Sequence, residues 1–296
     1  MTPLASPPSS ASGFASKAWL GEKGLSFSLN GVSVGLAQTR LRGVLPLTFT
    51  PPWALHVGLH GELETQRQLM SSCLATSSLL QVLDLGPSAH VSLEAPQGWH
   101  EVKRHTRQCT WSESGSWGIG KTRHKQAQRF LRDEGSVRIS HDVEAWHHVH
   151  ALHLSSRSRK GLAHHGAALS SLLNRLATQS WTFVVLAHNR EGECVASGGF
   201  VILPDQTCVY AFGGQVRSKV SGRASVAMLL AAMDEARNRG CSTFDFGGSQ
   251  DPGVDQFYAE FGASVVPMRR WIRTPWWFKR CFPRQWSTWT TPSRHF

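Results

Sequence analysis

The chain has 296 residues, of which 41% are hydrophobic, and a formal net charge of +11. This length suits two folded halves, and the hydrophobic fraction supports a buried core, which excludes an intrinsically disordered protein. No apolar run approaches the roughly 18–20 residues that a membrane-spanning helix needs. The excess of Lys and Arg predicts a negatively charged partner, such as a nucleic acid, an anionic lipid headgroup or a phosphorylated cofactor. A basic surface without a dedicated partner is the equal alternative.

The N-terminal residues and the cysteines bear on location. Residues 1–15 are rich in Ser, Pro and Ala, with no basic start and no apolar core. They therefore predict a disordered tail over 1–16 rather than a secretory signal. Six cysteines are scattered without a Cys-x-x-Cys pair, which predicts reduced thiols and a cytoplasmic protein.

Hydrophobic alternation in the first half predicts paired strands over 25–29 and 32–36, joined by an Asn-Gly turn. Further strands are predicted over 41–50, 81–85 and 99–109. A helix is predicted over 64–80, and a basic helix over 121–132. We assign these elements to an N-terminal half over residues 17–140.

The pattern is sharper in the second half, over residues 141–275. We expect two helices over 142–154 and 167–177, followed by three antiparallel strands over 181–187, 194–203 and 208–212. A helix over 225–239 and a strand over 243–246 come next. The helix over 225–239 is the best defined, because its apolar residues share one face. These elements predict a mixed α/β fold whose mainly antiparallel sheet is flanked by helices. A basic, Trp-rich tail follows over 276–296.

One segment is more informative than the rest. The run Phe244-Asp-Phe-Gly-Gly-Ser249 closes a buried strand, and Phe257-Tyr258 comes shortly before Phe261-Gly262 on an expected short helix. The second motif resembles the end of the GCN5-related N-acetyltransferase (GNAT) domain. The first resembles the subset related to the Fem-type peptidoglycan bridge-forming transferases. The resemblance covers about residues 167–273 and implies two GNAT-like halves, the first of them degenerate.

The resemblance implies a site for acyl-coenzyme A before the helix over 225–239. GNAT enzymes hold the pyrophosphate with a Gln/Arg-x-x-Gly-x-Gly/Ala turn, which the run Lys219–Ala224 resembles, with Lys219 keeping the positive charge. Small residues let the backbone approach the phosphates, and the helix N-terminus supplies N–H groups. Gly213-Gly214 is expected to end the preceding strand. The residues assigned to donor binding are Gly213, Gly214, Lys219, Gly222, Arg223 and Ala224.

A plain surface loop is the alternative interpretation of this turn, with Ser221 or Ser225 as the helix N-cap. Arg217 is a further candidate for a phosphate contact, because a guanidinium pairs with phosphate through two hydrogen bonds.

The resemblance also implies a catalytic role for Tyr258, whose hydroxyl would protonate the departing thiolate of coenzyme A. The alternative is that Tyr258 only packs. Asp245 lies in an otherwise apolar strand and is a candidate base or substrate anchor, with hydrogen bonds to the Gly247-Gly248 turn as the alternative. Asp251 and Asp255 are candidates for contact with an acceptor amine.

Other clusters point to partners rather than to chemistry. Four histidines share the helix over 142–154, but no Cys or Glu completes a metal-binding set, so we predict no metal site. The basic helix over 121–132 and the Trp/Arg segment over 271–286 suit single-stranded nucleic acid or a membrane interface. Alternatively, the segment over 271–286 caps the core.

Three functional hypotheses follow. The preferred one is an N-acyltransferase that moves an acyl group from acetyl-CoA or another acyl-CoA to an amine on a small molecule or peptide. The second is aminoacyl-tRNA-dependent transfer, as in Fem-type enzymes, although no heptad stretch predicts their usual helical arm. The third is a catalytically degenerate GNAT fold that binds nucleic acid, such as tRNA, or a membrane surface. The fold leaves the acceptor open.

Overall fold

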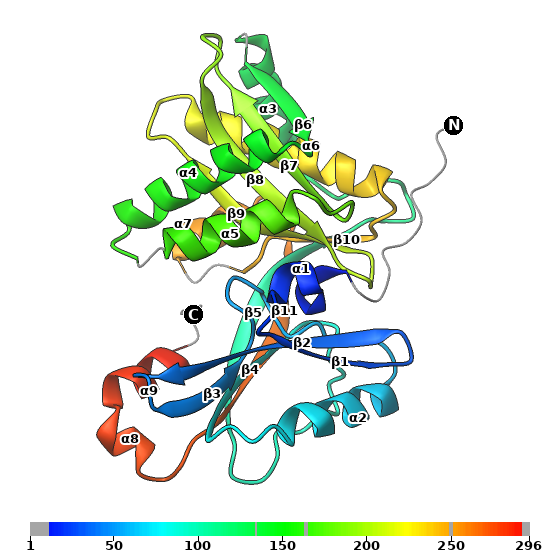
Figure 1. Cartoon of the computed structure of the whole chain (residues 1–296). Helices are drawn as coiled ribbons and strands as arrows, with labels where there is room; N and C mark the ends of the chain where they lie inside the picture. The colour runs from blue at the N-terminus through cyan, green and yellow to red at the C-terminus, as the bar shows by residue number, and fades with distance from the viewer. Residues whose placement is uncertain (1–11, 134, 163–164, 249–250, 292–296) are drawn as a thin grey trace. The chain divides into compact units, whose positions relative to one another are not determined.

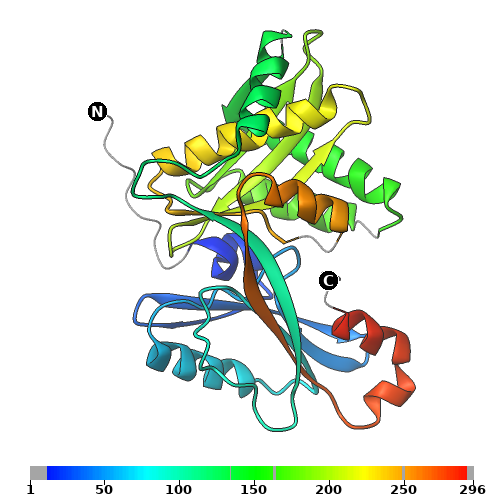
Figure 2. The same ribbon diagram turned by 180° about the vertical axis from the view of Figure 1, so that it is seen from behind.

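The computed structural model describes residues 12–133, 135–162, 165–248 and 251–291 (Figures 1 and 2). Most of the N-terminal tail expected over 1–16 therefore lies outside the described residues. The motif residue Ser249 also lies outside them. The chain divides into two compact units, each discontinuous in sequence. Of the described residues, unit 1 contains those of Gln108–Phe246 and Gln256–Ser264, and unit 2 contains residues 12–107, those of Gly247–Asp255 and residues 265–291.

Unit 2 is built on a sheet with the strand order β1-β2-β3-β4-β11-β5. Its strands are β1 (Leu25–Leu29), β2 (Val32–Leu41), β3 (Leu45–Phe49), β4 (Leu80–Leu85), β11 (Ser264–Arg273) and the first part of β5 (His100–Thr110). Its helices are η1 (Gly13–Ala15), α1 (Lys17–Leu20), α2 (Leu63–Leu74), α8 (Phe278–Cys281) and α9 (Pro283–Thr290). The expected hairpin forms, with β1 and β2 antiparallel and Asn30 and Gly31 at positive φ.

Unit 1 continues from the last part of β5 in the order β5-β10-β9-β8-β7-β6. Its strands are β6 (Ser136–Ser140), β7 (Thr182–His188), β8 (Cys194–Ile202), β9 (Thr207–Gln215) and β10 (Thr243–Asp245). Its helices are α3 (Lys121–Arg132), α4 (Val143–Arg159), α5 (Gly166–Leu176), α6 (Ser221–Asn238) and the end of α7 (Pro252–Ala259). Helices α4 and α5 cover one face of this sheet, and α6 covers the other (Figures 1 and 2).

The fold class predicted from the sequence is confirmed. The eleven strands of the described chain form a mixed sheet in which most neighbours are antiparallel. The parallel pairs are β3 with β4 and β10 with β9. The predicted halves, 17–140 and 141–275, do not coincide with the compact units, since α3 packs against α6 inside unit 1.

Several predicted element boundaries were wrong. Helix α2 ends at Leu74 rather than near residue 80, because the Thr76 hydroxyl donates to the carbonyl of Cys73 at 2.9 Å and turns the chain. Helix α4 continues to Arg159 rather than ending near residue 154, and helix α6 begins at Ser221 rather than at residue 225. Strands β6 and β11 were not predicted.

Each unit has its own hydrophobic core. The core of unit 1 joins α6 to the sheet and includes Phe183, Phe200, Phe244, Phe246 and Phe261. Unit 2 has two smaller clusters, one around Trp271 and one around Trp289. Among the described residues, none of the helices combines the length and the apolar character that crossing a membrane requires.

A buried ion cluster crosses the sheet of unit 2. Asp84 on β4 accepts hydrogen bonds from Arg104 on β5 and, through both carboxylate oxygens, from Arg270 on β11 at 2.8 and 3.0 Å. Burial alone would raise the pKa of Asp84, but the two guanidinium groups lower it to about 2. Arg270 also donates to the carbonyl of Trp289 at 3.2 Å, so the cluster fixes α9 against the sheet.

Candidate active site

The site begins where two neighbouring strands of unit 1 part. Strands β9 and β10 pair in parallel from Thr207 with Thr243 to Val209 with Asp245. Strand β10 then ends at Asp245, whereas β9 continues to Gln215, so the pairing of the two strands stops at Val209. On its other side β9 carries a bulge, because Phe200 pairs with Tyr210 and Gly199 with Phe212. The two strands therefore part inside the domain, after Val209 and Asp245.

Aromatic side chains line this divergence. The ring of Tyr258, on α7, stacks on Phe246 at 4.9 Å and lies edge-on to Tyr210 at 6.5 Å. Tyr258 is half-buried. Burial raises the pKa of Tyr210, which keeps its hydroxyl protonated. Both tyrosines of the chain therefore meet here. The sequence motifs identified Tyr258 but gave no role to Tyr210. The only feature of the sequence that could have drawn attention to Tyr210 is that the chain has just two tyrosines.

The motif around Tyr258 is explained by its neighbours. The guanidinium of Arg123, on α3, lies 4.6 Å from the ring of Phe257 and 5.3 Å from that of Phe261, and it forms an ion pair with Glu260. Gly262 has a φ of +83°, and a Cβ there would lie 2.7 Å from the carbonyl oxygen of Gly118. These contacts fasten α7 to unit 1 on both sides of Tyr258.

Gly213 and Gly214 do not end a strand, so that expectation was wrong. Both lie within β9 and pair with Gly198 and Ser197. A Cβ added to Gly213 would fall 1.6 Å from the hydroxyl of Tyr210, and one added to Gly214 would fall 2.2 Å from the carbonyl oxygen of Leu152 on α4. Their small size is required by packing. Their assignment to donor binding stays a prediction.

The N-terminus of α6 follows this strand. Its N-cap residue, Val220, makes no side-chain capping bond, and the first turn holds no acidic residue. The N-cap alternative was therefore wrong: Ser221 donates to the carbonyl of Ser218 at 2.9 Å, and Ser225 donates to the side chain of Gln215. Gly222 is exposed, with open space where a side chain would stand. An anion is favoured at such a helix end.

The other residues assigned to donor binding differ in environment. Lys219 is exposed in the loop before α6, whereas Ala224 is fully buried in the core. Arg223 forms an ion pair of 2.8 Å with Asp133 at the end of α3, which sequence analysis did not identify. A phosphate bound at the helix end would compete with Asp133 for this guanidinium.

Asp245 is buried, with 1% of its surface exposed, and its carboxylate accepts a hydrogen bond of 2.8 Å from the Gln108 side chain on β5. The two other candidate carboxylates are also engaged. Asp255 forms a two-pronged ion pair with Arg107 at 2.9 and 2.6 Å, and the hydrogen bond from Arg107 lowers its pKa. Asp251 accepts the N–H of Gly253 at 3.0 Å.

The histidines of α4 are separated by their environments. The half-buried His153 donates through Nδ1 to the carbonyl of Gly213 at 3.2 Å, and partial burial together with nearby Arg157 lowers its pKa to about 4. His150 contacts the carbonyl of Gly166 at 3.0 Å through Nε2. Across the described ranges, no cluster of three or more His, Cys, Asp or Glu is arranged to hold a metal ion.

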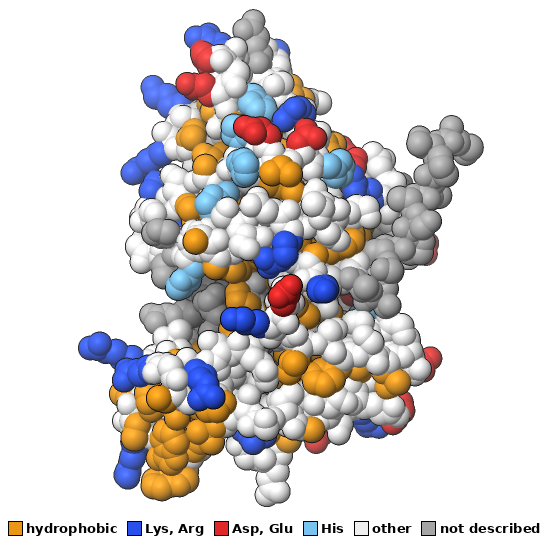
Figure 3. Space-filling view, in the orientation of Figure 1, with side chains coloured by type: hydrophobic (Ala, Val, Ile, Leu, Met, Phe, Trp, Pro, Cys, Tyr) orange, Lys and Arg blue, Asp and Glu red, His pale blue; other side chains and the backbone are white. Residues whose placement is uncertain are grey.

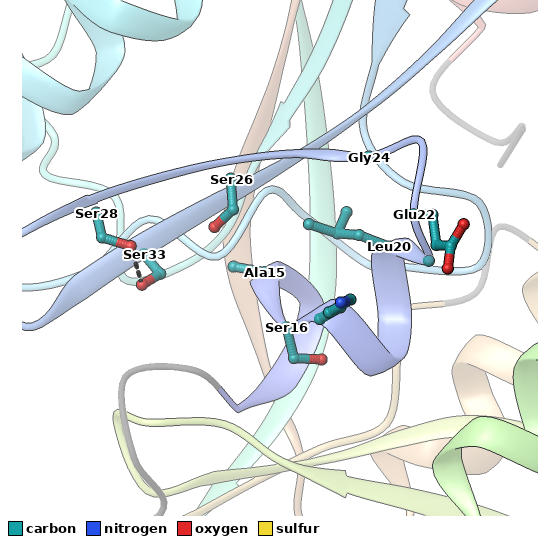
Figure 4. Close-up of a pocket in the computed structure, with 10 residues that line it drawn as sticks. Ala15, Ser16, Leu20, Glu22, Gly24, Ser26, Ser28 and Ser33 are labelled. Carbon is teal, nitrogen blue, oxygen red and sulfur yellow. Dashed lines mark hydrogen bonds between the residues drawn. The ribbon is translucent and has the colours of Figure 1, made fainter.

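A surface hollow of about 530 Å³ lies in unit 2, beside η1 and α1 (Figure 4). Its lining is rich in serine, but the hydroxyls are engaged: Ser28 bonds Ser33 at 2.8 Å, and Ser16 accepts the N–H of Trp19 at 3.1 Å. None of the described residues that line it is a histidine, the commonest base for activating a serine.

The geometry of unit 1 defines a class of protein: an acyltransferase-type fold with diverging central strands. A model of the acetyltransferase (GNAT) domain family matches residues 120–261, which begin just before α3 and end at Phe261. Both the match and the structural likenesses below agree with the sequence motifs. Residues 120–261 therefore form a GNAT-type acetyltransferase domain, and the chain as a whole shares its fold with the solved structures below.

Solved structures extend the likeness over nearly the whole chain. FemX is similar with a TM-score of 0.63 and 11% identity, over 86% of this chain and 91% of FemX. The C-terminal domain of a putative lysylphosphatidylglycerol synthetase from Agrobacterium fabrum has a TM-score of 0.55 and 9% identity, covering 93% and 92%. L-PGS from Bacillus licheniformis is similar with a TM-score of 0.55 and 11% identity, over 92% of this chain and 90% of that protein's chain. These identities establish a shared fold only. No curated protein sequence matches the chain.

Proposed function

We propose that the chain is an N-acyltransferase that takes its acyl group from acyl-CoA and passes it to an amine. One observation carries the proposal: within the residues that match the GNAT family, β9 and β10 diverge next to an uncapped helix N-terminus. A divergence of this kind offers an extended ligand a strand edge to pair with, while the helix end offers N–H groups to phosphate.

The proposed donor site places the pyrophosphate at Lys219–Ala224. The N–H groups at the start of α6 and the exposed Lys219 would bind the phosphate oxygens, and Gly222 would let them approach the backbone. The amide groups of the donor's arm would then pair with β9 beyond Val209, where its pairing with β10 has ended. Arg223 would join by exchanging Asp133 for phosphate.

In the proposed reaction the acceptor nitrogen attacks the thioester carbon, the C–N bond forms and the C–S bond breaks. The departing thiolate takes a proton from the Tyr258 hydroxyl, which lies at the divergence. The amine must lose one proton, and Asp245 is the carboxylate we assign to this step, with Gln108 orienting it. After the products leave, solvent carries the proton from Asp245 back to Tyr258, which restores both groups.

Aminoacyl-tRNA is the second candidate donor. It is implied by the resemblance to Fem-type transferases, and the net charge of +11 favours binding to a polyanion. Binding to tRNA would weaken steeply as salt rises, because each phosphate contact releases counterions.

Calorimetry with acetyl-CoA and CoA at moderate salt tests the proposal. We expect binding by the natural chain and at least about ten-fold weaker binding by Lys219→Ala with Arg223→Ala, because charge-assisted hydrogen bonds are lost. Asp133→Ala is the matched control: it breaks the same ion pair but leaves the cation, so donor affinity should hold or rise. Absence of CoA binding, with salt-sensitive binding of tRNA, would replace the proposed donor by aminoacyl-tRNA.

A further inference from the structure

The C-terminal helices of unit 2 carry an exposed apolar and basic surface that the acyl-transfer proposal does not use. We call it the α8–α9 face and define it by Arg42, Val44, Trp276, Lys279, Arg280 and Arg284. Trp276 is 82% exposed and Val44 is 65% exposed, and the four cations are also exposed. In Figure 3 the region appears at the lower left as a hydrophobic patch edged by Lys and Arg.

The face rests on a firm support. Phe278 and Trp289 are fully buried and stack at 5.0 Å, and Phe282 stacks on Phe278 at 5.0 Å. The carbonyl of Trp289 is held by Arg270 of the buried ion cluster. Because Phe278 and Trp289 pack in the core, the segment that carries Trp276 is held in place, and Trp276 is exposed on an ordered surface. The expectation that the segment caps the core is therefore right for its inner rings.

Two segments far apart in sequence build the face. The guanidinium of Arg42, in the turn between β2 and β3, lies 4.9 Å from the ring of Phe282. The ammonium of Lys279 lies 4.5 Å from the ring of Trp286. These contacts hold the cations beside the aromatic rings, and the first places the turn that carries Val44 against the C-terminal helices of unit 2.

The charge of the face is uniformly positive in its own segments. No Asp or Glu follows Glu260 in the chain, and none occurs between Val32 and Thr50. Positive charge that surrounds exposed apolar side chains complements an anionic interface with an apolar interior. Tryptophan lies at the headgroup level of a bilayer, while Lys and Arg reach the lipid phosphates.

We infer that the α8–α9 face docks the protein on a membrane surface that contains anionic lipid headgroups. A single strand of nucleic acid fits the observations less well, because base stacking needs open ring faces. The rings of Phe282 and Trp286 instead each have a cation, Arg42 or Lys279, beside them, which leaves Trp276 as the open ring of the face rather than a row of rings. The aliphatic side chain of Val44 can neither stack on a nucleobase nor form a hydrogen bond with it, but it can insert at the boundary between the lipid headgroups and the acyl chains. The inference stands independently of the donor in the proposed reaction.

Co-sedimentation of the full chain with vesicles tests the inference. The vesicles consist of phosphatidylcholine alone or with about one quarter phosphatidylglycerol. We expect binding to the anionic vesicles only, weakened at least about ten-fold by Trp276→Ala and about five-fold for each cation removed in Lys279→Ser with Arg280→Ser. Val91→Ala and Arg67→Ser are matched controls, since these residues are equally accessible in unit 2 but lie outside the face.

A second measurement reports on the face itself. Cys281, on α8, is exposed, whereas Cys194 is half-buried with a pKa raised to about 11 by burial. In a Cys194→Ser background, an environment-sensitive dye on Cys281 should shift to shorter wavelengths when anionic vesicles are added. Equal binding of the face variants and the controls would overturn the inference, as would an unshifted dye. Loss of tRNA binding in the face variants, without vesicle binding by the natural chain, would assign the face to nucleic acid.

Discussion

Replacing Gly214 by alanine separates the packing role of the glycine pair from the donor-binding role that the sequence suggested. The added Cβ would stand 2.2 Å from the carbonyl oxygen of Leu152 and 2.7 Å from the backbone nitrogen of His153. Real Cβ atoms do not approach backbone atoms so closely, so α4 would have to move away from β9. Gly222→Ala is the matched variant, because a Cβ there meets nothing within 4 Å.

The magnitudes follow from these contacts. Overpacking against backbone costs about 2–3 kcal/mol, which lowers the Tm of a chain of this size by about 4–12 °C. Alanine at Gly222 should leave stability unchanged or raise it by up to about 1 kcal/mol, because glycine is a poor helix former. In the proposed site, however, a methyl group at Gly222 would obstruct phosphate and cost about 1.5–3 kcal/mol, or about 10–100-fold in CoA affinity.

Thermal unfolding and calorimetry with CoA, at a temperature where both variants are folded, measure the two effects. We expect Gly214→Ala to lose stability but keep its donor affinity, and Gly222→Ala to do the reverse. A Tm unchanged in Gly214→Ala would refute the packing argument. Equal loss of CoA affinity in both variants would return Gly214 to the donor site.

Three further predictions follow. Tyr258→Phe should lower kcat about 10²–10⁴-fold in steady-state assays while CoA affinity holds, and weak donor binding would instead show a structural role. Asp84→Asn should cost about 3–5 kcal/mol in urea unfolding at neutral pH, because two buried guanidinium groups lose their carboxylate. With a folded pKa of about 2, Asp84 contributes stability above about pH 4 that is lost as pH falls toward 2, and Asn should remove that pH dependence. The pKa of His153 is lower in the folded chain than in the unfolded chain, so the unfolded chain binds the proton first as pH falls. The free energy of unfolding should therefore decrease by about 2 kcal/mol between about pH 6.5 and about pH 4. An equal decrease in His153→Gln would contradict this.

Local pattern was enough where an element makes its own hydrophobic face or turn. Helix α3 has the predicted bounds, and the hairpin of β1 and β2 forms around its Asn-Gly turn. The GNAT resemblance came from a short segment whose residues contact one another or nearby elements. By contrast, β11 was missed because it alternates poorly and is stabilised by pairing with β4, which lies far away in the sequence.

The candidate site shows the same division. Tyr258 and the Lys219–Ala224 turn were found from motifs, but the partners that define their environments were not. Gln108 reaches Asp245 across 137 positions, and Asp133 reaches Arg223 across 90. The glycine pair was expected to end a strand, whereas it lies within β9 against the backbone of α4 and the hydroxyl of Tyr210.

By itself, the sequence determined the family resemblance, the mixed α/β class and the amphipathic helices, because these depend on residue type and on spacings within one element. Only the tertiary structure decided how Asp84 is balanced by two arginines, why Gly213 and Gly214 must be small, and which tryptophans of the C-terminal segment face outward. Burial and ion pairing depend on which distant segments meet, and the order of residues along a strand or helix carries no local record of that.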